Sequence, residues 1–252
     1  GASNTSGHVE QSLGPYRKMT KPALILTRPR LACTRFAQSL SPKLLSRVTL
    51  VISPLLQIEP VDTPVDLDGV GGVIFTSANG VMHGPDGDGV TAYCVGEITA
   101  EAAIARGWRV QFHAPDAARL VPMLVQHGPA TPLLHLRGTH QRGDVADKLT
   151  QSGLLTHVVV LYDQKALPLT DAAQAALVSG APAIVPLFSP RTAAQFADQV
   201  PDMANAIIIA LSDAVAEALG PKEVRQLLVA AEPTTTSLRF TLETAVDWNR
   251  LA

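Results

Sequence analysis

Hydroxyl and amide side chains follow a short apolar run in the first third of the chain. Residues 73–75 are β-branched and aromatic, as in a strand buried on both faces, and Thr76, Ser77 and Asn79 come after them. Such side chains cap a helix or hydrogen-bond a ligand. A later apolar run ends in the same way at Ser189. We interpret both places as strand ends that present polar groups to a ligand.

Three segments of the first half of the chain have counterparts in the second half at a nearly constant offset. The matched pairs are Ser77 with Ser189, Gly96 with Ser212, and Arg28 with Arg137. We interpret them as two copies of one unit rich in strands and helices, each with three polar strand ends. The alternative is that unrelated α/β domains share small residues after their strands.

The composition is that of an ordinary globular protein. The chain has 252 residues, of which 46% are hydrophobic and 17% charged, enough for one to two domains with buried cores. The net charge of −2 gives no general attraction to nucleic acids or anionic membranes, so we expect neither as a partner. No apolar run approaches the roughly 20 residues that span a bilayer, and no signal-like stretch begins the sequence. We expect a cytoplasmic protein.

Residue types that bind metals or catalyse hydrolysis lack the spacing that these roles need. The seven histidines form no HxxxH or HExxH motif, and Cys33 and Cys94 form no CxxC motif. Neither Ser77 nor Ser189 lies in a GxSxG elbow, and no glycine-rich phosphate loop occurs. We therefore expect no metal and no cofactor, histidines in packing or surface positions, and buried, reduced cysteines.

Strand-like and helix-like runs alternate along the chain. We expect strands at residues 22–26, 73–75, 91–96, 108–112, 132–136, 157–162, 183–188, 207–211 and 227–230, and helices at residues 31–40, 99–106, 117–127, 145–151, 172–178, 191–196, 213–219 and 237–248. The extended runs at 48–52 and 55–58, interrupted by Pro54, are expected to cross between two regions. The glycine-rich residues 80–90 are expected to form a loop.

This alternation predicts an α/β protein with two parallel-sheet domains. Residues 1–20 are polar and without period, so we expect a tag or disordered leader there, with Met19 as the native start. The predicted domains are residues 21–52 with 163–252 and, inserted between them, residues 63–155, and the predicted crossing strands are residues 53–62 and 156–162. Parallel sheets bind ligands beyond the carboxyl ends of their strands, so the polar ends would line a cleft between the domains.

Seven short motifs together resemble one known family. They are TRP at 27–29, FTSANG at 75–80, VGEITA at 95–100, LRG at 136–138 followed by Arg142, VLY ending at Tyr162, FSP at 188–190 and EPT at 232–234. In this order and spacing, from about residue 21 to the carboxyl end, the sequence resembles uroporphyrinogen-III synthase. The family fold is two flavodoxin-like α/β domains, the second inserted into the first and joined to it by a two-stranded ladder.

The resemblance implies an enzyme of tetrapyrrole, porphyrin and heme biosynthesis. Its reaction closes the linear tetrapyrrole hydroxymethylbilane to uroporphyrinogen III, with loss of water and inversion of the terminal pyrrole ring through a spirocyclic intermediate. The pyrrole nitrogens supply the electrons, so no cofactor is implied. We expect a monomer that works in an interdomain cleft and contacts the preceding tetrapyrrole enzyme transiently.

The resemblance also suggests roles for particular residues. Tyr162 would give a proton to the departing hydroxyl at the end of the return strand; the alternative is a strand tyrosine with a wet tip. The substrate is a polycarboxylate, which helix amino termini, hydroxyls and a few cations can hold without a basic surface. The candidate substrate contacts are Thr27, Arg28, Thr76, Ser77, Asn79, Gly96, Thr99, Arg137, Gly138, Arg142, Ser189 and Ser212. The alternatives are helix caps for the hydroxyls and a structural salt bridge for Arg28.

The sequence departs from the family pattern in two places. Ser212 stands where the second VGxxTA-like segment usually has glycine, and Val215 stands where it usually has threonine. The segment after FTSANG is short and glycine-rich where a helix is usual. One alternative function is a cytoplasmic two-domain protein that binds or senses a small anion without catalysis. A second is a family member that is fused or paired with other tetrapyrrole enzymes, or that has kept the fold without the activity.

Overall fold

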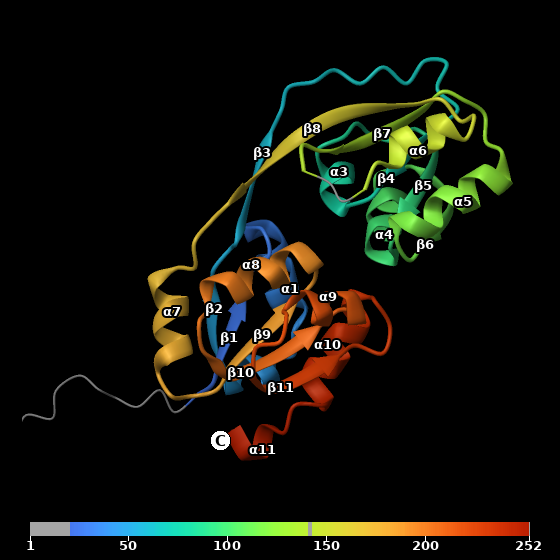
Figure 1. Ribbon diagram of the computed structural model, residues 1–252. Coiled ribbons are helices and arrows are strands. Elements are labelled where there is room, and N and C mark those ends of the chain that lie inside the picture. Colours follow the sequence, from blue (N-terminus) through green and yellow to red (C-terminus); the bar gives the residue numbers. More distant parts are fainter. Residues whose placement is uncertain (1–20, 141–142, 252) are drawn as a thin grey trace, which may run out of the picture.

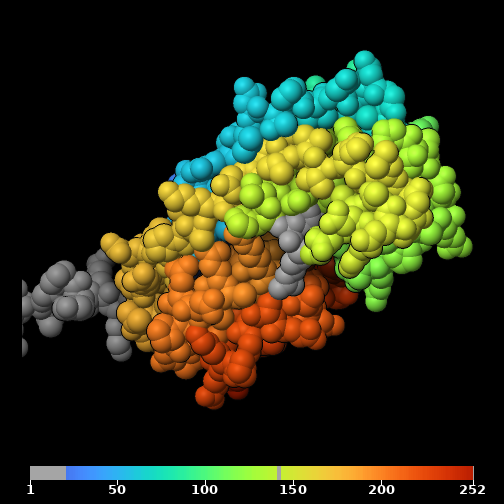
Figure 2. All heavy atoms as spheres, turned by 45° about the horizontal axis from the view of Figure 1, so that its top comes forward, coloured from blue at the N-terminus to red at the C-terminus, as the bar shows by residue number. Residues whose placement is uncertain are grey.

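The computed structural model describes residues 21–140 and 143–251. They form two lobes, each built around one sheet, and crossing strands connect the lobes (Figure 1). In the space-filling view the green and yellow middle of the chain forms one mass, and the orange and red carboxyl-terminal part forms the other (Figure 2). The expected leader, residues 1–20, and Arg142 lie outside the described residues. No helix among the described residues is both long enough and apolar enough to cross a membrane.

Sheet A brings together segments from both ends of the chain. Its five parallel strands lie in the order β11-β10-β9-β1-β2. They are β1 (Ala23–Leu26), β2 (Thr49–Ile52), β9 (Ala183–Leu187), β10 (Met203–Ala210) and β11 (Val224–Val229). Side chains of β1 alternate, with Ile25 in one core and Leu24 in the other, so the strand is buried on both faces.

Sheet B is built from the middle of the chain. Its order is β3-β8-β7-β4-β5-β6, and all neighbours are parallel except β3 and β8. The strands are β3 (Leu56–Pro60), β4 (Gly72–Phe75), β5 (Thr91–Val95), β6 (Arg109–Ala114), β7 (Leu133–Gly138) and β8 (Thr156–Ala166). The prediction of an α/β protein with parallel sheets is confirmed, and the antiparallel crossing makes sheet B mixed.

Helices cover both faces of each sheet. In lobe A, which is sheet A with its helices, one face packs against α1 (Arg30–Ser39), α2 (Pro42–Arg47), α10 (Thr235–Thr244) and α11 (Trp248–Leu251), and the other against α7 (Asp171–Val178), α8 (Pro190–Gln199) and α9 (Asp213–Ala218). In lobe B, which is sheet B with its helices, one face packs against α3 (Ala78–Met82) and α4 (Glu97–Ala105), and the other against α5 (Ala117–His127) and α6 (Val145–Gln151). Both lobes are therefore three-layered.

The strands of the two sheets correspond to each other after a circular permutation of the chain. Sheet A reads β2-β1-β9-β10-β11 and the parallel part of sheet B reads β8-β7-β4-β5-β6, so each strand of one sheet has a counterpart in the other. The order in sheet A is that of flavodoxin-like folds. The residue pairs matched in the sequence lie at or directly after counterpart strands, as Ser77 follows β4 and Ser189 follows β9. This supports the interpretation of the chain as two copies of one unit.

The crossing differs from the sequence prediction. The run at 48–52 is β2, which pairs with β1 inside sheet A, so only β3 crosses on the outward path. The return strand does not end at Tyr162, because β8 continues to Ala166, and the antiparallel ladder pairs Tyr162 with Pro60 and Ala166 with Leu56. The part of β8 before Tyr162 pairs with β7 in sheet B.

Three further elements differ from the prediction. Helix α2 is absent from the predicted elements, and its Ser41 cap accepts a hydrogen bond from Leu44 N. The single helix expected at 237–248 is two helices, because α10 ends before Ala245 and α11 begins only at Trp248. The loop expected at 80–90 holds for its later part, while its first residues complete the five-residue α3.

Candidate active site

In the interior of each sheet, two neighbouring strands lead to helices on opposite faces, and the chain continues from them in opposite directions across the sheet. In sheet A, α1 follows β1 on one face and α8 follows β9 on the other. In sheet B, α6 follows β7 on one face and α3 follows β4 on the other. Ligands of parallel α/β sheets bind outside the strand ends at such a switch point. The two switch points are therefore the places to examine.

The switch point of sheet A carries a cation and an unpartnered hydroxyl. Thr27 is 1% exposed, and its Oγ1 has no hydrogen-bond partner among the described residues. The guanidinium of Arg28 lies 4.2 Å from the centroid of the Phe188 ring. Burial lowers the pKa of Arg28, and contact with the electron-rich ring offsets part of the cost of burying the charge. Within the described ranges, Arg28 makes no salt bridge to an acidic side chain. The structural salt bridge that the sequence left open as its alternative role is therefore not formed there.

The two candidate serines of lobe A cap helices. Ser189 Oγ accepts a hydrogen bond from Thr192 N at 3.1 Å and donates to Thr192 Oγ1 at 2.8 Å, at the start of α8. Ser212 Oγ accepts from Val215 N at 3.3 Å, at the start of α9. The capping role that the sequence left open is therefore present at both positions. A ligand contact by these hydroxyls would have to share the cap.

The switch point of sheet B carries a buried neutral imidazole. His135 on β7 is 1% exposed, and its Nε2 lies 3.0 Å from Thr76 Oγ1. Burial, assisted by the nearby charge of Arg137, lowers the pKa of His135 to about 3. The ring is therefore neutral at physiological pH. Ser77 caps α3 by accepting a hydrogen bond from Asn79 N at 3.2 Å.

Tyr162 lies at the junction of three strands. It is paired with Gly138 of β7 and with Pro60 of β3, where β8 changes from its parallel partner to its antiparallel one. The ring packs against Gly138, where an added Cβ would come within 2.4 Å of Tyr162 Cε2. The His83 ring centroid is 5.4 Å away. The phenol is thus held beside the sheet B switch point with 2% of the residue exposed.

Opposing effects act on the Tyr162 phenol. Burial raises its pKa, because a phenolate loses hydration in the interior. The nearby side chains of Ser77 and Gln164, the backbone of Gly138 and the charge of Arg137 oppose this rise. The phenol therefore stays protonated at neutral pH while neighbouring groups favour its ionised form. A protonated phenol can give a proton to a departing oxygen, and its raised pKa makes it a weak acid.

The remaining candidates occupy less direct positions. The Arg137 guanidinium turns back and donates to the carbonyl oxygens of Gly138 and Thr139, at 3.1 and 3.2 Å. Gly96 begins α4 with φ +84°, a backbone conformation that favours glycine. Its counterpart Ser212 is extended, with φ −153°, which any residue adopts, so glycine is not needed there. Thr99 is buried on α4.

The structure gathers the candidate residues into two groups. Thr27, Arg28 and Ser189 lie at neighbouring strand ends of sheet A, and Thr76, Ser77, Asn79, Gly138 and Tyr162 surround the switch point of sheet B. Gly96 and Ser212 each lie one strand further along. Sequence reasoning missed Phe188, His83 and Gln164. Phe188 precedes Ser189 in the FSP motif, and Gln164 is two residues from Tyr162 on the same side of a strand.

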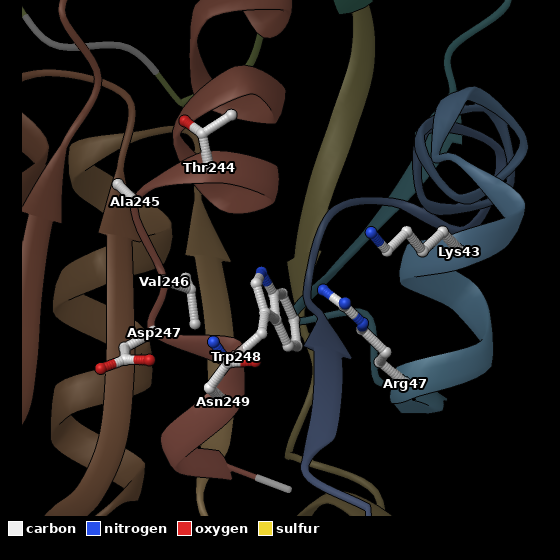
Figure 3. Close-up of a pocket in the computed structure, with 8 residues that line it drawn as sticks. All are labelled: Lys43, Arg47, Thr244, Ala245, Val246, Asp247, Trp248 and Asn249. Atoms are coloured by element: carbon white, nitrogen blue, oxygen red, sulfur yellow. The ribbon is translucent and has the colours of Figure 1, made fainter.

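A pocket of about 560 Å³ lies elsewhere, beside the carboxyl end of α10. It is lined by Lys43, Arg47, Thr244, Ala245, Val246, Asp247, Trp248 and Asn249. Lys43 and Arg47 point from α2 toward Trp248 (Figure 3). The carboxyl end of α2 leads into the start of β2, and α10 returns from the carboxyl end of β11, so this pocket lies toward the amino ends of the strands, away from the switch point. We do not include it in the candidate active site.

Metal-ligating side chains do not gather within the described ranges. There, no group of three or more His, Cys, Asp and Glu residues could hold a metal ion. Cys33 and Cys94 are free and buried, as the sequence predicted. Burial raises the pKa of Cys33 to about 11 and that of Cys94 to about 12, so neither thiol is poised for nucleophilic chemistry.

Two α/β lobes whose sheets correspond after a circular permutation, joined by crossing strands, place the chain among two-lobed α/β proteins. A family model described as "Uroporphyrinogen-III synthase HemD" matches residues 46–239. The chain belongs to the uroporphyrinogen-III synthase family.

Two solved structures have a similar fold. The uroporphyrinogen-III synthetase of Helicobacter pylori is 18% identical, covers 89% of this chain and 100% of its own, and gives a TM-score of 0.58. A mutant uroporphyrinogen III synthase from the extremely thermophilic bacterium Thermus thermophilus is 15% identical, covers 88% of this chain and 98% of its own, and gives a TM-score of 0.52. No curated protein sequence matches significantly.

Proposed function

We propose that this chain cyclises hydroxymethylbilane to uroporphyrinogen III, with loss of water and inversion of the terminal pyrrole ring. The family match over residues 46–239 supports this function. The observation that carries it is the place of Tyr162, a protonated phenol at the junction of β7, β8 and β3 beside a switch point. A protein that only binds an anion has no need of such a proton donor, so the anion-sensor alternative is not favoured.

Tyr162 acts as the general acid in this proposal. The bond between the terminal carbon and its hydroxyl breaks as a pyrrole nitrogen supplies electrons, and the phenol gives its proton to the departing oxygen, so water leaves. The freed carbon first bonds to the α-carbon of the terminal ring that already carries the methylene bridge, which gives a spirocyclic intermediate. The bond from that α-carbon to its old bridge then breaks, the bridge carbon bonds to the other α-carbon of the same ring, and the proton lost from this second α-carbon restores the phenol. Atoms and charge balance without a cofactor. A general acid contributes about 10²- to 10⁴-fold to such a step.

The switch point of sheet A holds substrate carboxylates in this proposal. The Arg28 cation and the free Thr27 hydroxyl supply a charge-assisted and a neutral hydrogen bond. The amino end of α8, next to Ser189, adds backbone N–H groups and the positive end of a ten-residue helix. Gly96, Thr99, Ser212, Arg137 and Arg142 are secondary candidates for the remaining carboxylates.

The lobes move relative to each other when the substrate binds, in our proposal. Only 2% of Tyr162 is exposed, so a substrate reaches the phenol only if groups that cover it, His83 among them, are displaced. The moving bodies are the predicted domains, residues 21–52 with 163–252 and residues 63–155. We also propose a cytoplasmic monomer that contacts the preceding tetrapyrrole enzyme transiently, because its substrate closes spontaneously to the uninverted ring.

The test is a coupled assay in which freshly generated hydroxymethylbilane is cyclised with and without the protein. The oxidised products are then separated as isomers I and III. We expect isomer III to predominate with no added metal or cofactor. If isomer I forms at the same rate with the protein as in buffer without it, the proposal is overturned. The anion-binding alternative would then be the better explanation.

A further inference from the structure

The pocket at the amino ends of the sheet A strands gathers three side chains that only donate hydrogen bonds. It has a volume of about 560 Å³ and lies between α2 and the end of α10. Lys43 and Arg47 are four residues apart on α2 and share a face of that helix, and both point toward Trp248 of α11 (Figure 3). An ammonium, a guanidinium and an indole N–H contain no acceptor, so a ligand that binds them must supply the acceptors.

The two cations of the pocket have no acidic partner. Within the described ranges, neither Lys43 nor Arg47 forms a salt bridge. The carbonyl groups that end α10 attract cations, yet among the described residues no hydrogen bond joins them to either side chain. The guanidinium of Arg47 lies 5.9 Å from the centroid of the Trp248 ring, so it contacts the indole instead. Two positive charges therefore face the same pocket without being neutralised.

Two acidic side chains lie nearby, but both have other partners. Asp247 lines the pocket, and its carboxylate points away from Trp248 and from the two cations (Figure 3). That carboxylate lies 3.6 Å from Nε of Arg250. Glu243 accepts a hydrogen bond from Ser41 N at 3.0 Å, at the start of α2. The side of the pocket that the cations occupy is therefore positively charged.

The third donor is buried and unpartnered. Nε1 of Trp248 is closed to solvent and has no hydrogen-bond partner among the described residues. Native proteins leave few buried donors in this state, so each one calls for an explanation. Packing alone does not supply one, because an apolar ring of the same shape would fill the space without the cost of an unmade hydrogen bond. A bound acceptor does supply one, when the flexible Lys43 and Arg47 side chains rotate and carry it to the indole.

We propose that this pocket binds a small molecule through its phosphate group. A phosphate monoester carries close to two negative charges at neutral pH and three terminal oxygens, which match two cations and one neutral N–H. A carboxylate offers one charge and two oxygens and matches the three donors less well. The volume of the pocket is in the range of small-molecule sites, so it has room for the organic part of such a ligand. The pocket lies away from both switch points, so its ligand takes no part in the proposed reaction.

The test follows the indole N–H signals of the full chain by NMR. The chain has two tryptophans, and the Trp248 signal is assigned by its loss in Trp248→Phe. Inorganic phosphate is the probe, and acetate at the same ionic strength is the carboxylate counterpart. We expect phosphate to move the Trp248 proton downfield in a saturable way, because the N–H gains a charged acceptor, and to bind at least about tenfold more tightly than acetate. Trp108, whose Nε1 is also buried and unpartnered among the described residues but lies in lobe B, is the internal control and should not move.

Variants of the two cations separate a site from general electrostatics. We expect Lys43→Met and Arg47→Met each to raise the Kd for phosphate about tenfold, since each removes a charge-assisted hydrogen bond. Arg35→Met removes an exposed cation of α1 outside the pocket, and its Kd should stay within twofold of the wild type. An unchanged Trp108 signal shows that each variant is folded. A Trp248 signal that does not respond to phosphate, or that responds equally in Arg47→Met and the wild type, would overturn the inference, and an equal affinity for acetate would reject phosphate as the ligand group.

Discussion

The switch points of the two sheets share a topology but carry different chemistry. In sheet A, Arg28 stacks on Phe188 and the hydroxyl of Thr27 is unpartnered among the described residues. In sheet B, His135 is neutral and contacts Thr76, and the Tyr162 ring packs against Gly138. A cation and a free hydroxyl suit the binding of carboxylates, whereas a protonated phenol beside neutral groups suits proton transfer. We infer that lobe A mainly binds and lobe B mainly reacts.

The helices after the two switch points differ for a local reason. α8 has ten residues, and its Arg191, Gln195 and Gln199 side chains hydrogen-bond to the segments that enter and leave the crossing. Its counterpart α3 has five, and a Cβ added at its Gly80 would come within 2.7 Å of Leu136 O, so this short helix lies close against β7. The same position in the fold therefore anchors the crossing in lobe A and packs tightly against the sheet in lobe B.

Removing the phenol should have the largest effect. We expect Tyr162→Phe to lower kcat by about 10²- to 10⁴-fold, the usual contribution of a general acid, and to shift the product toward isomer I. Tyr93→Phe is the matched control, because Tyr93 is also buried in sheet B but packs in the core on the opposite face. Both variants are measured in the isomer assay. An equal fall in kcat in the two variants would mean that Tyr162 has a packing role and is not the general acid.

Displacing the phenol without removing it should have the next largest effect. In Gly138→Ala the new Cβ would come within 2.4 Å of the Tyr162 ring, so the ring must move, and we expect kcat to fall about 10- to 100-fold. Gly72→Ala makes a similar contact, 3.0 Å from Tyr93 Cε2, away from Tyr162. It should cost about 1–2 kcal/mol of stability and leave kcat unchanged. Steady-state kinetics and urea unfolding distinguish the two, and a catalytic loss in Gly72→Ala would contradict this difference.

A change in lobe A should affect binding instead. We expect Arg28→Met to raise KM about tenfold with kcat within twofold, since a charge-assisted hydrogen bond to a carboxylate is lost. Arg30→Met removes an exposed cation two residues away and is the control for general electrostatics. KM is compared at low and moderate salt, with the melting temperature of each variant. A fall in kcat with KM unchanged would place Arg28 in the chemical step and break the division between the lobes.

Most of the fold could be predicted because its strands are apolar runs that end in small polar residues. The errors arise where one signal has two meanings. Ser41-Pro42 is typical of the end of a helix, although a serine cap followed by proline also begins one, as it does in α2. The period of the last helix continues past Ala245, where the local backbone ends α10. Periodicity does not reveal which partner a strand takes, so the predicted extent of the crossing is also wrong.

The sequence indicates which polar residues lie at strand ends, but it does not indicate which of them lie together in the candidate site. Thr27, Ser77 and Ser189 are visible because each follows an apolar run. The contacts that give the ends their chemistry join residues far apart in the chain, such as Thr76 with His135 and Arg28 with Phe188. The sequence predicts a packing or surface position for His135, and the structure buries the residue in sheet B, but a single sequence does not indicate its hydroxyl partner. Only the strand order brings these side chains together.

The buried imidazole of sheet B should affect stability more than catalysis. The pKa of His135 is about 3 in the folded chain and about 6.5 when unfolded, so between these pH values the unfolded chain binds a proton that the folded chain does not. The contribution of the neutral imidazole to the free energy of unfolding is therefore complete above pH 6.5 and is lost as the pH falls toward 3. From pH 7.5 to pH 5 this amounts to about 2 kcal/mol.

His135→Gln removes the titration and keeps a side chain that can hydrogen-bond Thr76. We expect its free energy of unfolding, measured by urea at pH 7.5 and at pH 5, to fall by about 2 kcal/mol less than that of the wild type. His157→Gln, at an exposed position on β8, should leave the wild-type dependence unchanged. If His135→Gln and the wild type lose the same free energy of unfolding between pH 7.5 and pH 5, the imidazole takes up a proton in the folded chain as well. A neutral His135 would then no longer distinguish the switch point of sheet B from that of sheet A.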